Sequence, residues 1–259
     1  MGRRTSADMG LFLGTAQMSA AVAAPVIIAM VIWERLDPSE EIDRKGSFPL
    51  DSVFAICSFL ASFLVSMMLL SSVLTPILEQ HPWFMGLRGS PWGLRLLGGL
   101  LIGDLLYYVL HRWGFHTRPL WKAHFIHHSI EHLYWYSSTR SSVIQALGIT
   151  FVFCIGFNLM MLDVQHMQIG LMILGTSSVF SHSNIATRLG AIEWFLVTPA
   201  HHRMHHVELE ETHDMMFAGV FSFFDRIFGT YVEPTEELLR GPKGQEFDLH
   251  SVPRHVLGI

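Results

Sequence analysis

The sequence predicts an all-α integral membrane protein with about four transmembrane helices or hairpins. Half of its 259 residues are hydrophobic and only 15% are charged, whereas an average soluble domain has about 25% charged residues. The mean hydropathy is +0.36, and the apolar residues gather in long runs. A helix that crosses a hydrocarbon core of about 30 Å needs about 20 such residues in succession.

Three apolar runs in the first half of the chain predict spanning helices, and they cover residues 11–33, 53–78 and 94–112. The first run follows Arg3 and Arg4, as the apolar segment of a signal peptide does. It is longer than the about 7–15 residues of such a segment. We therefore expect a membrane helix there.

Residues 143–181 are predicted to form an apolar hairpin. Two apolar runs, Val143–Leu162 and Gln168–Phe180, are separated by a short polar stretch. The second run is shorter than the usual span of about 20 residues, which favours a tight hairpin. A hairpin that enters and leaves on one membrane face would bring the polar segments before and after it together.

The charge and cysteine content exclude two classes of site. The formal net charge is -5 and the arginines are scattered, so no basic surface for nucleic acid is predicted. Cys57 and Cys154 lie inside apolar runs, so neither a disulfide framework nor a thiolate metal site is predicted. Residues 233–259 are expected to form a polar, loosely packed tail in which the histidines are bystanders.

Membrane orientation stays open at this point. Arg3 and Arg4 would draw the N-terminus to the cytoplasm, while the basic residues between the first two runs compete with them. We expect a multi-pass protein of a bacterial inner membrane or of the endoplasmic reticulum. The aromatic group Leu133-Tyr-Trp-Tyr136 is expected to be either an interfacial belt or the wall of a substrate channel.

Histidines form two near-copies of one motif, His124-Phe-Ile-His127-His128 and His202-Arg-Met-His205-His206. Positions i, i+3 and i+4 of a helix share one face, so each copy predicts half of a metal cage. His111, His116 and His182 precede the two copies. Nine imidazoles are too many for one ion and indicate two, and imidazole suits iron, copper, nickel and zinc alike. The sequence thus predicts a helical di-metal site on one membrane face.

Short helices over Pro119–Ile130 and Pro199–Val207 are predicted to carry the two motifs. Thr198 is a suitable N-cap and Pro199 suits the first helical position. On this second helix His201 is rotated by about 100° from His202, so His202 is the expected ligand and His201 is not. His213 lies in an acidic run, where a surface histidine is expected more than a ligand.

Asp104, Tyr108 and His111 lie at i, i+4 and i+7 of the third apolar run. This stripe predicts a carboxylate that accepts the outer N–H of His111 and a phenol beside it. The alternative is a polar contact between helices. His116 follows His111 by five positions, so we expect both to face one ion only if the helix ends near Gly114.

These linked motifs resemble the fatty acid hydroxylase/sterol desaturase superfamily of membrane di-iron oxidases. The resemblance covers residues 103–232 and includes Asp104 with Tyr108, Leu120-Trp121 before the first histidine motif, His182-Ser-Asn184, Glu193, Thr198-Pro199 and Asp225-Arg-Ile-Phe-Gly-Thr-Tyr231. It implies two irons held by the nine histidines, with Asp104, Tyr108 and Glu193 as catalytic residues. It also implies dioxygen as co-substrate, hydroxylation or desaturation of a lipid C–H bond, and an external electron donor.

Two departures from the family pattern bear on the substrate. Ser141-Ser142 stand where family members commonly carry His-Pro, and Asp214-Met-Met-Phe-Ala-Gly219 lacks the common Asn-Tyr-Gly. Both departures argue against a sterol. His81-Pro82 continues as Trp83-Phe84 and so does not match a fused cytochrome b5. Electrons are therefore expected from a separate cytochrome b5, ferredoxin or reductase.

Two other functions fit a histidine-rich membrane protein. A metal transporter would hold its ligands near the bilayer midplane on broken helices, whereas most of these histidines follow apolar runs or lie in polar connectors. Their position favours the enzyme. A structural zinc site that pins the helices together is the second alternative, and activity restored only by ferrous iron would exclude it.

Overall fold

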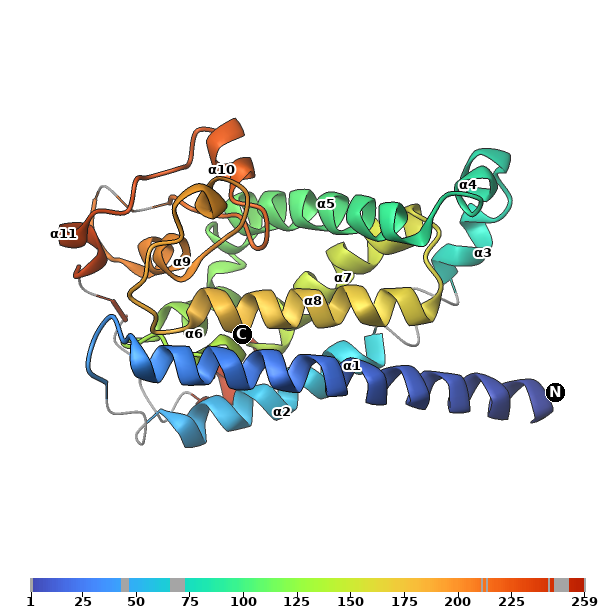
Figure 1. Ribbon diagram of the computed structural model, residues 1–259, viewed down its shortest axis with the longest axis horizontal. Helices are drawn as coiled ribbons and strands as arrows, with labels where there is room; N and C mark the ends of the chain where they lie inside the picture. The colour runs from blue at the N-terminus through green and yellow to red at the C-terminus, as the bar shows by residue number, and fades with distance from the viewer. Residues whose placement is uncertain are drawn as a thin grey trace.

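The computed structural model describes residues 2–42, 47–65, 73–210, 212, 214–241, 243–244 and 252–258. Its long helices are α1 (Gly2–Leu36), α2 (Phe48–Val65), α5 (Trp92–Leu110), α7 (Val143–Leu159) and α8 (Val164–His182). Apart from two isolated β-bridges, the described residues contain helices and loops alone. In Figure 1 the long helices run along the long axis of the molecule, and the short helices α6, α9, α10 and α11 gather at one end.

The prediction of an all-α protein is therefore confirmed, while the number of spans stays a prediction. Among the described residues, the segment Trp92–Phe115 is the one helix long and apolar enough to cross a membrane. Phe48–Ser58 and Val143–Leu159 are shorter apolar helices. The expected run 53–78 is described as α2 and α3 (Thr75–Leu78), and its residues 66–72 lie outside the described chain.

Helices α5 and α7 pack closely because glycines line their contact. A Cβ on Gly156 would lie 2.4 Å from the carbonyl oxygen of Gly99 and 2.7 Å from the amide nitrogen of Gly103. Small residues spaced by four let two membrane helices approach backbone to backbone. The two helices run in opposite directions, since Gly98 meets Met160 while Gly148 meets Leu110. The end of α5 therefore lies beside the start of α7.

A π-helical turn, His111–Phe115, continues α5. The N–H of His116 donates to the carbonyl oxygen of His111, five residues back, at 3.1 Å. Such a wide turn brings residues five apart almost into register, and π turns are frequent at functional sites. The two imidazole rings lie 5.1 Å apart. The helix ends at Phe115, one residue after Gly114, as expected, and the wide turn before this end brings the two rings together.

The two histidine motifs lie on α6 (Trp121–His128) and α9 (Pro199–His206), within two residues of the predicted bounds at each end. At the start of α9 the hydroxyl of Thr198 accepts the N–H of His201 at 3.4 Å, and Pro199 takes the first position. The cap fixes the register of α9, so the side chains of its histidines point in defined directions.

Two residues of the aromatic group 133–136, predicted as an interfacial belt or a channel wall, contact α2. Tyr134 is buried, and its hydroxyl donates to the carboxylate of Asp51 on α2. Tyr136 stacks on Phe48, with ring centroids 4.7 Å apart. The group therefore packs α2 against the core of the protein.

The C-terminal segment is better packed than the sequence predicts. It forms α11 (Glu236–Leu239) and α12 (Val252–Leu257). Helix α12 contacts α6 and α7, and a Cβ on Gly258 would meet Ala123 at 3.1 Å. Residues 245–250 lie outside the described chain, so the expectation for His250 is untested there.

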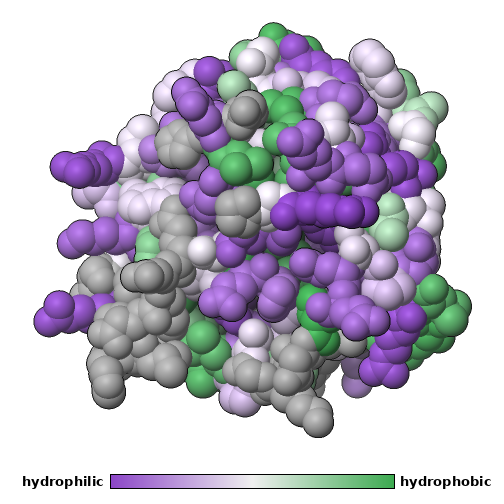
Figure 2. All heavy atoms as spheres, turned by 90° about the vertical axis from the view of Figure 1, so that its left-hand side faces the viewer, coloured by the Kyte–Doolittle hydropathy of each residue, from purple (hydrophilic) through white to green (hydrophobic). Residues whose placement is uncertain are grey.

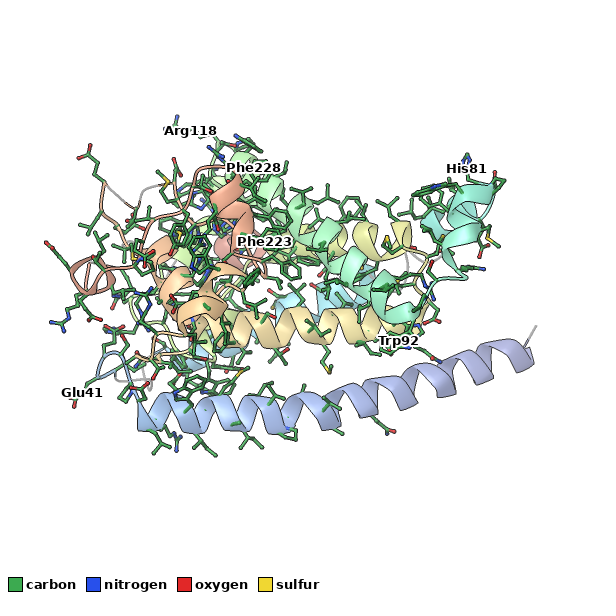
Figure 3. All side chains as sticks on the ribbon, turned by 45° about the horizontal axis from the view of Figure 1, so that its top comes forward. Glu41, His81, Trp92, Arg118, Phe223 and Phe228 are labelled. Atoms are coloured by element: carbon green, nitrogen blue, oxygen red, sulfur yellow. The ribbon has the colours of Figure 1, made fainter. Side chains whose placement is uncertain are left out.

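The two ends of the molecule differ in character. The end that carries α9 and α11 is mostly hydrophilic (Figure 2), whereas the long helices expose large apolar side chains such as Ile32, Ile56 and Leu97. Arg118 and Phe228 lie near the hydrophilic end, and His81 and Trp92 lie near the opposite one (Figure 3). The helix termini that carry the histidines thus meet at the polar end of an otherwise apolar bundle.

Candidate metal centre

The nine predicted histidines come together as two clusters. Cluster A contains His111, His116, His124, His128 and His205, and cluster B contains His127, His182, His202 and His206. Eight of the nine residues are buried, and the side chain of His116 is 8% exposed. Their ligand atoms come from the end of α5, from α6, from the end of α8 and from α9.

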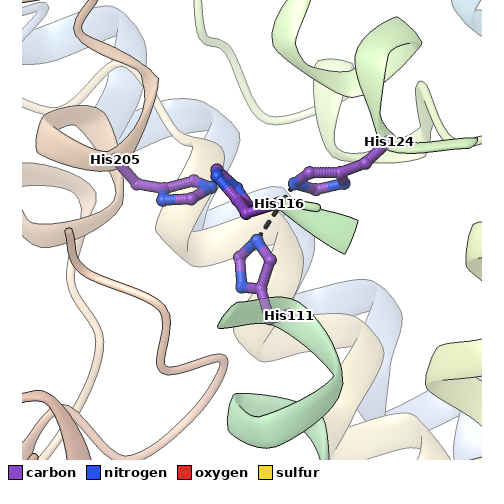
Figure 4. Close-up of side chains that lie close together, drawn as sticks. All are labelled: His111, His116, His124 and His205. Atoms are coloured by element: carbon purple, nitrogen blue, oxygen red, sulfur yellow. Dashed lines mark hydrogen bonds between the residues drawn. The ribbon is translucent and has the colours of Figure 1, made fainter. Parts of the chain in front are cut away.

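In cluster A the Nε2 atoms converge. The distance between Nε2 atoms is 3.0 Å for His111 and His124, 3.2 Å for His124 and His128, and 3.1 Å for His128 and His205. The rings of His111, His116, His124 and His205 point toward a common centre in Figure 4. His116 also bonds Asp214 through Nδ1, at 2.9 Å.

Cluster B has the same arrangement. The Nε2 atom of His206 lies 3.2 Å from those of His127 and His202. The Nε2 atom of His182 lies 3.0 Å from that of His202 and 3.4 Å from that of His127. Nitrogen ligands about 2.1 Å from one ion would be about 3.0 Å apart at right angles and about 3.4 Å apart in a tetrahedron. The spacing in both clusters therefore fits a metal ion.

Backbone carbonyls fix the protonation of several rings. The Nδ1 atom of His111 lies 2.8 Å from the carbonyl oxygen of Phe217, and that of His205 lies 3.0 Å from the carbonyl oxygen of Met215. His127 bonds the carbonyl of Arg140 in the same way. A carbonyl can only accept, so Nδ1 carries the proton and the lone pair of Nε2 points into the cluster.

Lone pairs that face one another need a cation between them, so the donor set fits metal binding. Burial lowers the pKa of His205 and His206 well below the usual 6.5, and the charge of neighbouring imidazoles lowers it further. The same causes lower the pKa of His124 and His202. These rings are therefore neutral at pH 7, the form in which imidazole binds metal.

Two buried carboxylates hold the loop 215–221, which supplies carbonyls to cluster A. Asp225 accepts the N–H groups of Phe217 at 2.6 Å and of Ala218 at 3.0 Å. Asp104 accepts the three following N–H groups, those of Gly219, Val220 and Phe221, at 2.7–3.1 Å. The loop is thus bonded to carboxylates on its N–H side and to histidines on its carbonyl side.

The predicted contact between Asp104 and His111 was therefore wrong. The outer nitrogen of His111 bonds the carbonyl of Phe217, and Asp104 acts on the ring through the loop that contains this carbonyl. Sequence periodicity shows which residues share the face of a helix, but it does not show a loop that comes between them. Asp225 has no predicted role of its own, although it begins a motif of the family resemblance.

Tyr108 also points away from the predicted position. Its hydroxyl lies 2.6 Å from Thr230 Oγ1 and accepts a hydrogen bond from Arg112. Tyr107 contacts His111 instead, stacked at 5.0 Å between ring centroids. Residues four apart on a helix lie one above the other, which places Tyr107 under His111. The sequence analysis missed this residue.

Glu193 and His201 bond partners outside both clusters. The Glu193 carboxylate accepts several hydrogen bonds from Arg188 and one from the N–H of Leu189. Its contacts are those of a structural ion pair. The Nε2 atom of His201 lies 3.0 Å from the carboxylate of Asp225. His213 lies outside the described residues.

Replacing Asp104 with Asn should weaken cluster A. The amide offers one acceptor oxygen where three N–H groups converge, so at least one buried N–H loses its partner, at a cost of about 1–3 kcal/mol. We expect a loss of about 10–100-fold in activity, as is typical when the support of a metal ligand is removed. Metal content and thermal unfolding of the purified variant measure both effects.

Asp163→Asn is the matched control for this prediction. Asp163 caps α8 by accepting the N–H of His166, and asparagine caps a helix equally well. This variant should behave as wild type. Wild-type metal content, stability and activity in Asp104→Asn would show that the loop does not depend on the carboxylate.

A cavity of about 700 Å³ extends from cluster B between the long helices. Its wall includes His127, His182 and His202 at one end and apolar residues of α7 and α8 along its length. A second pocket, of about 120 Å³, lies against cluster A and is lined by Trp121, Glu208 and Asp214 among others. The long apolar cavity therefore reaches cluster B and the small polar pocket reaches cluster A.

Known proteins resemble this chain over the segment that carries the histidines. The family model for fatty acid hydroxylase matches residues 96–230. Alkylglycerol monooxygenase of Xenopus tropicalis is 32% identical over 171 residues, which are 63% of this chain and 35% of that protein. The Homo sapiens alkylglycerol monooxygenase is 30% identical over 163 residues, which are 62% of this chain and 34% of that protein.

A bacterial relative matches with lower identity. Ornithine lipid hydroxylase OlsE of Rhizobium tropici is 25% identical over 170 residues, which are 64% of this chain and 50% of that protein. The chain thus spans about a third of the length of the alkylglycerol monooxygenases and half of the length of the ornithine lipid hydroxylase. No solved structure matches.

Proposed function

Because this chain belongs to the fatty acid hydroxylase family, we propose that it is a membrane hydroxylase that uses dioxygen and a di-iron centre to oxidise a C–H bond of a lipid. The observation that carries the proposal is the position of the nine histidines. They form two clusters with metal-ligand spacing, and one cluster closes the end of a long apolar cavity. Names of the relatives, alkylglycerol monooxygenase and ornithine lipid hydroxylase, also favour a lipid substrate.

Clusters A and B would each hold one iron ion through neutral imidazoles. The two ions would supply the activation of dioxygen. Hydroxylation places one oxygen atom in the lipid and reduces the other to water, so it consumes two electrons and two protons. We expect the electrons from an external cytochrome b5, ferredoxin or reductase.

The residues of the chain would bind and orient the substrate. Apolar side chains of the cavity, such as Ile149, Phe153 and Leu174, would hold the acyl or alkyl chain and exclude water from it. Tyr107 lies in the cavity wall near the histidines and would limit which carbon reaches cluster B. Asp104 and Asp225, whose carboxylates bind the N–H groups of the loop 215–221, would keep the ligands of cluster A in place.

We also propose that the long helices cross the membrane, with the metal centre at one face. The apolar surface of the long helices and the polar end around α9 support this orientation. Both clusters lie at the ends of α5 and α8, whereas a transporter would hold its ligands near the middle of the bilayer. Position and family together favour the oxidase over the metal transporter.

The test is turnover by the purified full chain in lipid nanodiscs, loaded with ferrous iron and supplied with a reductant and labelled dioxygen. We expect lipid products that carry one labelled oxygen atom, detected by mass spectrometry. Products that lose two hydrogens and gain no oxygen would instead identify a desaturase. Activity with zinc alone, or rapid metal flux across the membrane without lipid oxidation, would contradict the proposal.

A further inference from the structure

Gln145 is a buried polar side chain that the hydroxylase mechanism leaves without a role. It lies in the wall of the cavity on the first turn of α7 and is 2% exposed. Its Oε1 atom is buried without a hydrogen-bond partner among the described residues. A buried polar group left unpaired costs about 1–3 kcal/mol, so a partner that enters the cavity would relieve this cost.

The local sequence offers Gln145 a partner that it does not use. Ser142 caps α7 by accepting the N–H of Gln145 at 3.1 Å, so Gln145 occupies the third helical position. In a capping box the glutamine at this position reaches back to the backbone N–H of the capping residue. Here its amide oxygen remains unpaired and the side chain lines the cavity instead.

Gln145 lies at the metal end of the cavity. The carbonyl of Arg140, five residues earlier, bonds His127 of cluster B. Phe153, at the far part of the same helix face, is about 12 Å along the helix from Gln145. Leu171 and Leu174 of α8 line the far part as well. The wall therefore changes from polar near cluster B to apolar away from it.

Three other polar side chains of the cavity wall are already paired. The hydroxyls of Ser138, Thr139 and Ser181 donate to backbone carbonyls at 2.8–3.0 Å. Lys, Arg, Asp and Glu are absent from the wall among the residues that the structure describes. A charged head group would find no counter-ion there, and burying an unpaired charge is far more costly than burying a neutral dipole.

We propose that Gln145 is a specificity-determining residue whose Oε1 accepts a hydrogen bond from a neutral polar group of the lipid, an amide or a hydroxyl. This group would lie within a few bonds of the carbon presented to cluster B, and the rest of the chain would extend toward Phe153 and Leu174. The Oε1 atom of glutamine only accepts, so its partner must carry an N–H or O–H. The inference rests on the proposed hydroxylase function and adds the position of attack.

Binding of three probes with the same sixteen-carbon chain tests the proposal: the primary amide, the carboxylate and the alkane. Each competes with a fluorescent fatty-chain reporter for the purified, iron-loaded full chain. We expect the amide to displace the reporter about tenfold better than either competitor, as one buried hydrogen bond allows. Equal displacement by the three probes in the wild type would overturn the inference without any variant.

Gln145→Met removes the amide at nearly constant volume and should abolish most of this tenfold preference. Gln168→Met is the matched control, because its Oε1 is also buried and unpaired but the residue lies outside the cavity wall. The control should keep the preference. Retention of the preference in Gln145→Met would contradict the proposal, and Gln145→Leu serves as a second variant if the first folds poorly.

Metal content separates a specific effect from misfolding, because neither glutamine contacts a cluster and both variants should keep two ions. Product analysis adds a second readout: wild type should oxidise the amide close to its polar group, and Gln145→Met should spread oxidation along the chain. If the protein binds the amide in preference to the other probes but forms no oxidised product, the hydroxylase proposal is wrong and the binding role of Gln145 stands. Oxidation at mid-chain in the wild type would reject the position that we infer.

Discussion

His205→Ala and His206→Ala, substitutions at adjacent positions, should each reduce turnover to background while removing different ions. The Nε2 atom of His205 lies 3.1 Å from that of His128 in cluster A, and that of His206 lies 3.2 Å from that of His127 in cluster B. Each variant loses one ligand of one ion. Metal analysis of the purified variants should fall from two ions per chain to one, and both should remain in the membrane because apolar helices dominate insertion.

Double variants identify which ion is lost. His127→Ala with His206→Ala removes two ligands of cluster B alone, so one ion should remain. His205→Ala with His206→Ala removes a ligand from each cluster, so none should remain. His132→Ala is the control, since His132 is half exposed and lies near Glu40. Turnover in any of the cluster variants, or equal metal content in the two double variants, would contradict the assignment of ligands to clusters.

The sequence predicted the histidines that come together but not how they divide. Spacing at i, i+3 and i+4 places three rings on one helix face, and α6 and α9 do carry the motifs there. On each helix, however, two neighbouring histidines reach different clusters. The division depends on how α6 and α9 face each other across the bundle, and that tertiary arrangement leaves no periodic signal.

The supporting residues were harder to predict for a related reason. Carbonyls of Phe217 and Met215 orient histidines, and any residue type offers a carbonyl, so the sequence carries no signal for them. Asp104 was identified as a buried acid of a membrane helix, and its partners proved to be backbone N–H groups. The spacing of His111 and His116 does not distinguish a π turn from an α-helix, so the π turn that aligns them could not be predicted.

His202→Ala should lose the ion of cluster B and all turnover, while His201→Ala should keep both ions. The Nε2 atom of His202 lies 3.0 Å from that of His182 and 3.2 Å from that of His206, so its removal opens the cluster. His201 instead bonds the buried carboxylate of Asp225. Metal analysis and turnover of the two variants, measured side by side, check the contrast.

The expected cost of His201→Ala is structural. Asp225 keeps its bonds to the N–H groups of Phe217 and Ala218 and to the hydroxyl of Thr230, so the loop over cluster A should stay in place. The lost hydrogen bond to a buried carboxylate should lower the free energy of unfolding by about 1–3 kcal/mol, with at most a modest drop in turnover. The reverse metal content, with His201→Ala losing an ion and His202→Ala keeping both, would mean that the register of α9 is wrong by one residue.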